Sequence, residues 1–408
     1  MKIKREIYLA KLRQLRDTNL IKVVTGMRRV GKSTLLADFR DELLASGVPA
    51  RRVHFVNLEQ RQSLPLTDWT AWHDKIEAAL DPRGVNYIFL DEIQMLNGFE
   101  RLLDSLFTKP NTDLYVTGSN AFLLSGELAT LLGGRHISVN VLPYSFAEFA
   151  LAFPHKGVDA LFRSYINSSA LPEAVTLAGR TPGHVNQYLR EVFESVVRKD
   201  IMTRAAIRDM ANFDSVSRFV FDSVGSFVSP RSITGSLNAG RRKGETGISH
   251  HTVESYLAHL TGAFVVYRAD RYDIKGRSLL KTQQKYYATD LGLKNAMSGT
   301  DSALNLGHKL ENIVYLELRR RNEGDIWVGK HDESEVDFVV QNHAGQRRYY
   351  QVAYTVAETE TLERELRPLR KIRDNHPKIL LTADPDEGTY EGIRKINILG
   401  WLAGPTGE

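Results

Sequence analysis

One stretch decides the fold of the N-terminal part of this chain: Gly26-Met27-Arg28-Arg29-Val30-Gly31-Lys32-Ser33-Thr34. It satisfies the phosphate-binding pattern G-x-x-x-x-G-K-[ST]. An apolar run before it, Ile21–Thr25, predicts a short buried strand, and the residues after it have helical spacing. Strand, glycine-rich turn and helix in this order predict a nucleotide site, whereas the alternative is an ordinary glycine-rich turn.

The residue types in this stretch suit the binding of ATP. Glycines let backbone N–H groups converge on phosphate oxygens, and the start of the helix adds partial positive charge. We expect Lys32 to reach the β- and γ-phosphates and the Ser33 hydroxyl to bind Mg²⁺. We expect the whole stretch from Gly26 to Thr34 to contact the nucleotide, with one alternative left open: Arg28 and Arg29 either touch the nucleotide or pair with a nearby Asp or Glu.

A second motif, Tyr87-Ile88-Phe89-Leu90-Asp91-Glu92, is an apolar run that ends in two acids. Such a run favours a parallel strand that is buried on both faces. Ligands bind at the carboxyl ends of such strands. We therefore expect Asp91 to hold Mg²⁺ and Glu92 to act as general base on the attacking water. The alternative is a pair of solvated acids in a loop.

Composition sets broad limits on the class of protein. The 408 residues are 42% hydrophobic and 25% charged, which is typical of a globular protein with several domains. No cysteine is present, so disulfides and thiolate metal sites are excluded. The sequence begins without a signal peptide and has no apolar run near the roughly 20 residues of a membrane span, so we expect a cytoplasmic protein with no membrane contact. The net charge of +5 permits nucleic-acid binding through local patches.

Residues 1–142 alternate strands with helices, which predicts an α/β domain with a doubly wound parallel sheet. Further strands are expected at Val53–Asn57, Leu114–Gly118 and Ile137–Val141. Ser119 and Asn120 follow the second of these and could hydrogen-bond the γ-phosphate or the attacking water. A helix is expected over residues 121–132.

The rest of the chain divides into three predicted parts. Residues 143–200 are helical and could form a lid behind the nucleotide. Residues 201–300 contain helices and then a strand pair, which favours a winged helix whose recognition helix is Ser249–Leu260. A basic loop precedes that helix, and its Arg241, Arg242 and Lys243 either contact DNA phosphates or are solvated. Residues 301–408 form a separate α/β domain.

Several strings together resemble the prokaryotic AAA-type (AAA+) ATPases that carry a C-terminal region of unknown function. The strings are the two motifs above, Thr117–Asn120, Pro143–Phe149, Leu171–Glu173, Arg271–Gly276 and Tyr287–Gly292. The resemblance implies an AAA+ core that works with ATP and Mg²⁺ as a homo-oligomer, of which a hexameric ring is one form. It also implies that Arg135 is an arginine finger for a neighbouring subunit, whereas the alternative is a surface arginine.

The last part also resembles the restriction-endonuclease-like fold. Glu311, Asp337 and Gln351 occur in the order of the metal-binding residues of those nucleases. The lysine that should stand two residues after Gln351 is replaced by Ala353, so we expect weak or no cleavage. Asp337 and Gln351 could also be ordinary polar residues at strand ends.

These features predict an ATP-hydrolysing protein that acts on DNA, with branched DNA in repair or replication as a plausible substrate. Two alternatives stay open. One is a regulatory or signalling ATPase whose winged helix contacts protein partners. The other is an ATP-gated nuclease, which the missing lysine disfavours.

Overall fold

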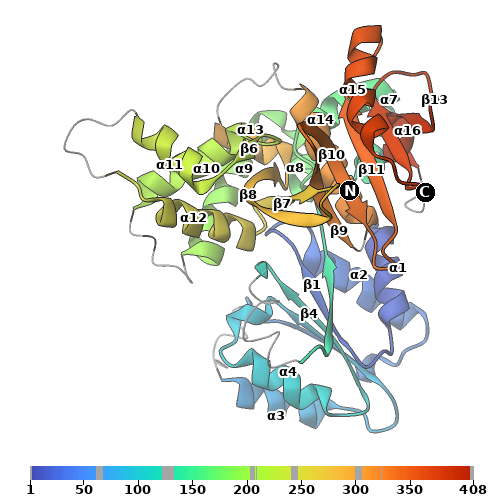
Figure 1. Cartoon of the computed structure of the whole chain (residues 1–408). Helices are drawn as coiled ribbons and strands as arrows, with labels where there is room; N and C mark the ends of the chain where they lie inside the picture. Colours follow the sequence, from blue (N-terminus) through green and yellow to red (C-terminus); the bar gives the residue numbers. More distant parts are fainter. Residues whose placement is uncertain are drawn as a thin grey trace. The chain divides into compact units, whose positions relative to one another are not determined.

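The computed structural model describes residues 2–60, 68–121, 133–202, 207, 209–239, 247–298, 306–322 and 324–404. The chain divides into two compact units, each with its own sheet (Figure 1). The first unit is Met1–Pro143 with Gly262–Phe264, and the second is Tyr144–Thr261 with Val265–Glu408. Within the described ranges, no helix is both long and apolar enough to cross a membrane.

The first unit alternates strands with helices along the chain. Its strands are β1 (Ile21–Thr25), β2 (Val53–Asn57), β3 (Asn86–Asp91), β4 (Thr112–Gly118) and β5 (His136–Asn140). Its α-helices are α1 (Glu6–Leu15), α2 (Lys32–Ala45), α3 (Trp69–Ala79) and α4 (Phe99–Phe107), and its short 3₁₀ turns are η1 (Ala50–Arg52) and η3 (Ile93–Met95).

The five strands form one parallel sheet in the order β2-β3-β4-β1-β5. This confirms the predicted parallel α/β sheet, and each predicted strand agrees with an observed strand to within two residues at either end. β1 and β3 are buried along their whole length, as expected for strands covered on both faces. The predicted helix at 121–132 lies outside the described residues, except for Ala121.

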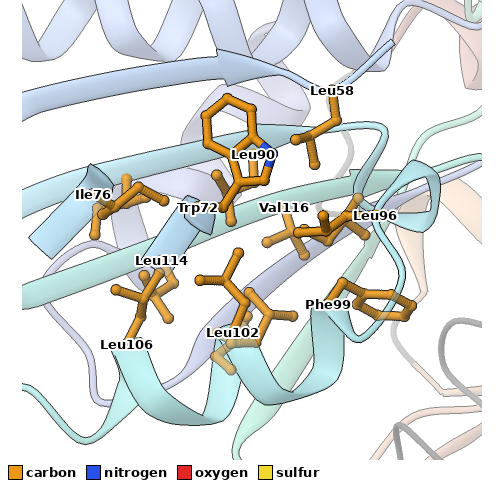
Figure 2. Packing of buried hydrophobic residues seen from close by; sticks show 14 of the residues in the cluster. Leu58, Trp72, Ile76, Leu90, Leu96, Phe99, Leu102, Leu106, Leu114 and Val116 are labelled. Atoms are coloured by element: carbon orange, nitrogen blue, oxygen red, sulfur yellow. The ribbon is translucent and has the colours of Figure 1, made fainter. Parts of the chain in front are cut away.

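Helices α3 and α4 cover one face of this sheet. Trp72 and Ile76 from α3 and Leu102 and Leu106 from α4 pack on the apolar side chains of β3 and β4 (Figure 2). Burying side chains of this size contributes roughly 1.5–3 kcal/mol each. This packing stabilises the strands whose carboxyl ends carry Asp91 and Ser119.

The second unit begins with helices. They are α6 (Phe146–Leu151), α7 (Val158–Asn167), α8 (Pro172–Arg180), η5 (Pro182–His184), α9 (Val185–Val196), the π-helical turn η6 (Val197–Ile201), α10 (Met210–Asp222), α11 (Pro230–Ala239) and α12 (His250–Gly262). α6 starts at a capping box, in which Ser145 accepts from the backbone N–H of Glu148 and the Glu148 side chain accepts from that of Ser145.

A nine-stranded mixed sheet forms the rest of the second unit, in the order β13-β14-β12-β11-β10-β9-β7-β8-β6. Its strands are β6 (Phe227–Val228), β7 (Val266–Asp273), β8 (Ser278–Ala288), β9 (Asp325–His331), β10 (Ser334–Gln341), β11 (Arg347–Ala353), β12 (Lys378–Thr382), β13 (Gly388–Tyr390) and β14 (Ile393–Asn397). The accompanying helices are α13 (Leu291–Ser298), α14 (Leu306–Arg321), α15 (Thr359–Lys371) and α16 (Ile398–Ala403).

Two of the predicted part boundaries do not match the structure, and this sheet crosses one of them. β7 pairs in parallel with β9, so strands from residues 201–300 and 301–408 share one sheet. The predicted boundary at residue 200 falls inside η6. Three helices and the β7–β8 hairpin occur where a winged helix is expected, but the winged-helix and endonuclease-like assignments, like the four-part division, stay predictions.

Candidate functional site

The phosphate-binding loop connects the end of β1 to the start of α2. Its backbone turns sharply, because Gly26, Arg29 and Gly31 all have positive φ, at 140°, 73° and 99°. A Cβ atom on Gly26 would lie 2.3 Å from the carbonyl oxygen of Val141. Glycine is therefore required at this position by both conformation and space.

Lys32 is a buried cation of the loop. Its Nζ donates to the backbone carbonyls of Gly26 and Met27 at 2.9 and 3.1 Å. The ammonium group is thus held against the loop at the N-terminus of α2, where the helix itself favours anions. This arrangement fits a phosphate group.

Asp91 joins the ends of three strands to the loop. Its Oδ1 accepts from the hydroxyls of Ser33 at 3.0 Å and Thr117 at 2.6 Å, and its Oδ2 accepts from Nδ2 of Asn57 at 2.8 Å. A serine hydroxyl and a carboxylate in contact are the hard oxygen ligands that Mg²⁺ prefers, so these residues fit the ion. Sequence reasoning missed Thr117 and Asn57 as partners of Asp91.

Glu92 has a left-handed backbone conformation directly after β3. Its backbone N–H donates to Oγ1 of Thr117 at 2.8 Å, and its carboxylate accepts from Nε2 of Gln94. The same Nε2 lies 3.2 Å from Oγ of Ser119. Gln94, which sequence reasoning also missed, therefore bridges the predicted base and the end of β4.

Ser119 and Asn120 are buried at the carboxyl end of β4. β4 lies between β3 and β1 in the sheet, so this end is adjacent both to the Asp91–Glu92 pair and to the loop after β1. The fold therefore gathers the predicted ATP, magnesium and water contacts at one edge of one sheet. Their individual roles stay predictions.

The two arginines of the loop, Arg28 and Arg29, differ in burial. Arg28 is buried, and its guanidinium lies 3.5 Å from a carboxylate oxygen of Glu59, whereas Arg29 is exposed. A contact of Arg28 with a nearby acid was one of the two possibilities that the sequence left open.

Arg135 lies at the opposite edge of the sheet. β1 and β5 begin together at Ile21 and His136, so Arg135 precedes the amino end of β5 while the loop follows the carboxyl end of β1. Five residues of strand separate the two edges by roughly 16 Å. The Arg135 guanidinium pairs with Asp104 at 2.9 Å. Arg135 is therefore distant from the loop of its own chain, and a role in a neighbouring subunit stays a prediction.

In the second unit, Glu311 from α14 and Asp337 from β10 lie together with Glu335. One carboxylate oxygen from each lies within 4.8 Å of the others. The Oε1 of Gln351 accepts from the backbone N–H of Asp337 at 3.4 Å. The structure therefore gathers the three residues of the predicted degenerate nuclease site, and adds a third acid that sequence reasoning did not include.

A lysine from β8 lies within this cluster. Nζ of Lys285 is 2.8 Å from Oε1 of Glu311, and it also pairs with Glu335. The ring of Phe227 lies 5.3 Å from the same ammonium group. Position 353 is alanine as the sequence shows, but the cluster has a cation. The sequence analysis did not identify Lys285, because the expected lysine position was two residues after Gln351, in β11.

Burial and charge shift the pKa values in this cluster. Burial raises the pKa of Asp337 well above its usual value, and the neighbouring Glu311 raises it further. Burial alone would lower the pKa of Lys285, but neighbouring carboxylates, first of all Glu311, outweigh that effect and raise it. The ammonium group therefore stays charged and holds the Glu311 carboxylate by Coulomb attraction.

The predicted DNA contacts, Arg241, Arg242 and Lys243, lie outside the described residues.

Comparisons with known proteins identify part of this architecture. Residues 18–150 match the model of an AAA domain, and residues 159–304 match a domain of unknown function. An uncharacterized protein of Haemophilus influenzae is 37% identical over 406 residues, which cover 98% of each chain. An uncharacterized protein of Methanocaldococcus jannaschii is 26% identical over 374 residues, which cover 86% of this chain and 78% of that protein.

Among solved structures, that of the Aeropyrum pernix ORC1 protein in complex with DNA is 16% identical and has a TM-score of 0.29. The similarity covers 74% of this chain and 94% of that chain. A score this low carries no argument about the present protein.

Proposed function

We propose that this chain, which belongs to the same family of AAA-domain proteins as the Haemophilus influenzae protein, hydrolyses ATP with Mg²⁺ and couples turnover to the binding or remodelling of DNA. The observation that carries the ATPase part is the contact between Ser33 and Asp91, with Lys32 and Glu92 beside it at the same sheet edge. Each residue type that the reaction needs is present there.

We assign a role to each residue from the chemistry of its side chain. Lys32 neutralises the β- and γ-phosphates, and Ser33 and Asp91 hold Mg²⁺, which supplies charge neutralisation when bound. Glu92 accepts a proton from the attacking water, and Gln94 orients its carboxylate. Ser119 or Asn120 hydrogen-bonds the γ-phosphate or that water. Arg135 stabilises transition-state charge at the site of a neighbouring subunit, in a homo-oligomer for which a hexameric ring is one candidate form.

The DNA part is supported by the residues of the second unit. Helix α12 follows the basic residues Arg241, Arg242 and Lys243 in the sequence and precedes the β7–β8 hairpin. A winged helix reads DNA with such a helix, and basic loops contact phosphates. Branched DNA in repair or replication is the substrate class that we favour.

A regulatory ATPase with protein partners and an ATP-gated nuclease are the alternatives. The position of Lys285 beside Glu311 is the observation that favours the nuclease. Against it, the ammonium group already pairs with two of the three acids and lies near Phe227. We therefore propose that this cluster does not cleave DNA.

One experiment separates these functions. ATP hydrolysis is measured with no DNA, then with single-stranded, duplex and four-way-junction DNA, and the DNA is inspected for cleavage in Mg²⁺ and Mn²⁺. Stimulation without cleavage supports the proposal. Hydrolysis with no DNA response and no DNA binding favours the regulatory alternative, and metal-dependent cleavage that is lost in Asp337→Asn favours the nuclease.

A further inference from the structure

The second unit has a hollow of about 790 Å³ whose lining is strongly basic. Five lysine and arginine side chains line it, namely Lys275, Arg367, Arg370, Lys371 and Arg373. Its two acids are Asp332 and Glu363. An adjoining hollow of about 430 Å³ shares Lys275 and Arg373 and adds Arg277 and Arg347. We call the two hollows together the basic groove.

Four segments distant in sequence build the basic groove. They are the turn between β7 and β8, the turn between β9 and β10, the turn between β10 and β11 with the start of β11, and the C-terminal part of α15 with the residues after it; α15 is labelled in Figure 1. α15 is fixed to the sheet by the buried side chains of Leu366 and Leu369. Arg367 and Lys371 are exposed on the same helix. Their charges are therefore carried by a helix that is packed on the sheet.

Most of the acids in the groove are already paired. Asp332 pairs with Lys275 at 3.3 Å, and Glu363 pairs with Arg370. Asp374, in the adjoining hollow, accepts from the hydroxyl of Tyr349 and lies 3.7 Å from Lys378. The positive charges of Arg367, Lys371 and Arg373 therefore exceed those that local acids balance. The groove therefore has a local excess of positive charge, although the net charge of the whole chain is only +5.

We infer that the basic groove binds the sugar–phosphate backbone of duplex DNA. Clustered arginines and lysines are the groups that neutralise phosphates and release condensed counterions. None of the described residues that line the groove is Phe, Tyr or Trp. Single-strand sites stack bases on such rings, so the lining favours a duplex backbone over an unpaired strand. The inference deepens the proposed DNA function and is independent of the Arg241–Lys243 loop.

The test compares two triple variants of the full-length protein. The groove variant carries Arg367→Gln, Lys371→Gln and Arg373→Gln. The control carries Arg163→Gln, Arg180→Gln and Arg198→Gln, which remove the same charge from exposed positions outside the groove. Glutamine keeps the helix propensity and most of the aliphatic stem. Binding of a labelled 30-base-pair duplex is titrated at several salt concentrations.

We expect the groove variant to bind more weakly and with a flatter dependence of log K on log salt, by about 0.9 for each phosphate that the protein no longer neutralises. Three such phosphates correspond to a decrease in affinity of roughly 500-fold at 0.1 M salt relative to 1 M, where the contribution vanishes. The control should bind like the native protein. The single variant Arg373→Gln, beyond the end of α15, should show the same direction with a smaller effect even if the triple variant is unstable.

Each other outcome overturns the inference in a recognisable way. Native-like affinity and slope in the groove variant remove the groove from the DNA surface while leaving the proposed function intact. Failure of the native protein to bind any DNA overturns both. Binding of polyglutamate as tightly as duplex DNA of equal charge would assign the groove to an acidic protein partner instead.

Discussion

Nζ of Lys285 lies 2.8 Å from Oε1 of Glu311, and both side chains are buried. The hydroxyl of Tyr287 donates to the same oxygen at 2.6 Å. A buried carboxylate is stable only when its charge is compensated, and here one strand, β8, supplies both the ammonium group and the hydroxyl. The relationship gives the cluster a structural role whether or not it has a chemical one.

Replacing Lys285 by methionine should therefore destabilise the protein strongly. The Glu311 carboxylate would remain buried without its cation, which costs about 3–5 kcal/mol. Urea unfolding measures the decrease in stability. The double variant Lys285→Met with Glu311→Gln should recover much of it, because the buried charge of Glu311 is then removed together with its partner. A single variant as stable as the native protein would show that the pair contributes little.

The variant Asp337→Asn should change how stability depends on pH. The pKa of Asp337 is raised by burial and by Glu311, so the folded protein keeps a proton that the unfolded chain releases above about pH 4. The stability of the native protein should then fall as pH rises from about 4 toward the folded pKa. Asparagine cannot ionise, so the stability of the Asp337→Asn variant relative to that of the native protein should increase with pH. Melting temperatures at pH 5 to 8 check this, with Asp41→Asn at an exposed position as control; a constant difference contradicts it.

Lys32→Ala and Glu92→Gln should impair ATP hydrolysis at different steps. Lys32→Ala removes the main charge partner of the phosphates, so tight nucleotide binding or hydrolysis should be abolished. Glu92→Gln keeps the shape of the side chain but not the base, so ATP should bind and turnover should fall, by roughly 10²–10⁴-fold. A fluorescent nucleotide and phosphate release measure the two steps. Native turnover in Glu92→Gln would rule out its role as base.

Gly26→Ala should disrupt the loop, because its Cβ would lie 2.3 Å from a backbone oxygen at a φ of 140°. Gly47→Ala is the matched control, since its φ is 92° with no atom within 4 Å of the new Cβ. Both variants have backbone strain, but only the first has a clash. We expect Gly26→Ala to lose ATP binding and more than about 1 kcal/mol of stability, and Gly47→Ala to bind normally. Equal ATP affinities in the two variants would contradict the steric argument.

Arg135→Ala should bind ATP normally and hydrolyse it poorly if the arginine acts on a neighbouring subunit. Mixing it with Glu92→Gln should restore activity at interfaces where one chain supplies the base and the other the arginine. Phosphate release from mixed oligomers, verified by native mass spectrometry, measures the rescue. Asp104→Ala, which removes only the partner of Arg135, is the control and should keep activity. No rescue in verified mixtures would count against action between subunits.

The sequence alone predicted the parallel sheet of the first unit and the grouping of two motifs at one edge of it, because these signals are local. Gly26–Thr34 and Tyr87–Glu92 are continuous motifs whose neighbours have strand or helix periodicity. In a parallel sheet the carboxyl ends of the strands share one edge, so the order of elements was enough to bring Ser33 and Asp91 together. The strands β13 and β14 were not predicted, since both are short and polar.

In the second unit, only the tertiary structure shows which distant side chains lie together. Lys285 meets Glu311 because helix α14 packs on strand β8, which no local pattern specifies. The basic groove likewise combines three turns with the end of α15. Motifs and periodicity depend on neighbours along the chain, whereas strand order depends on the burial of whole faces. The sequence therefore determined which residue types lie at the carboxyl edge of the parallel sheet, and the packing of the second unit determined which distant charges came together.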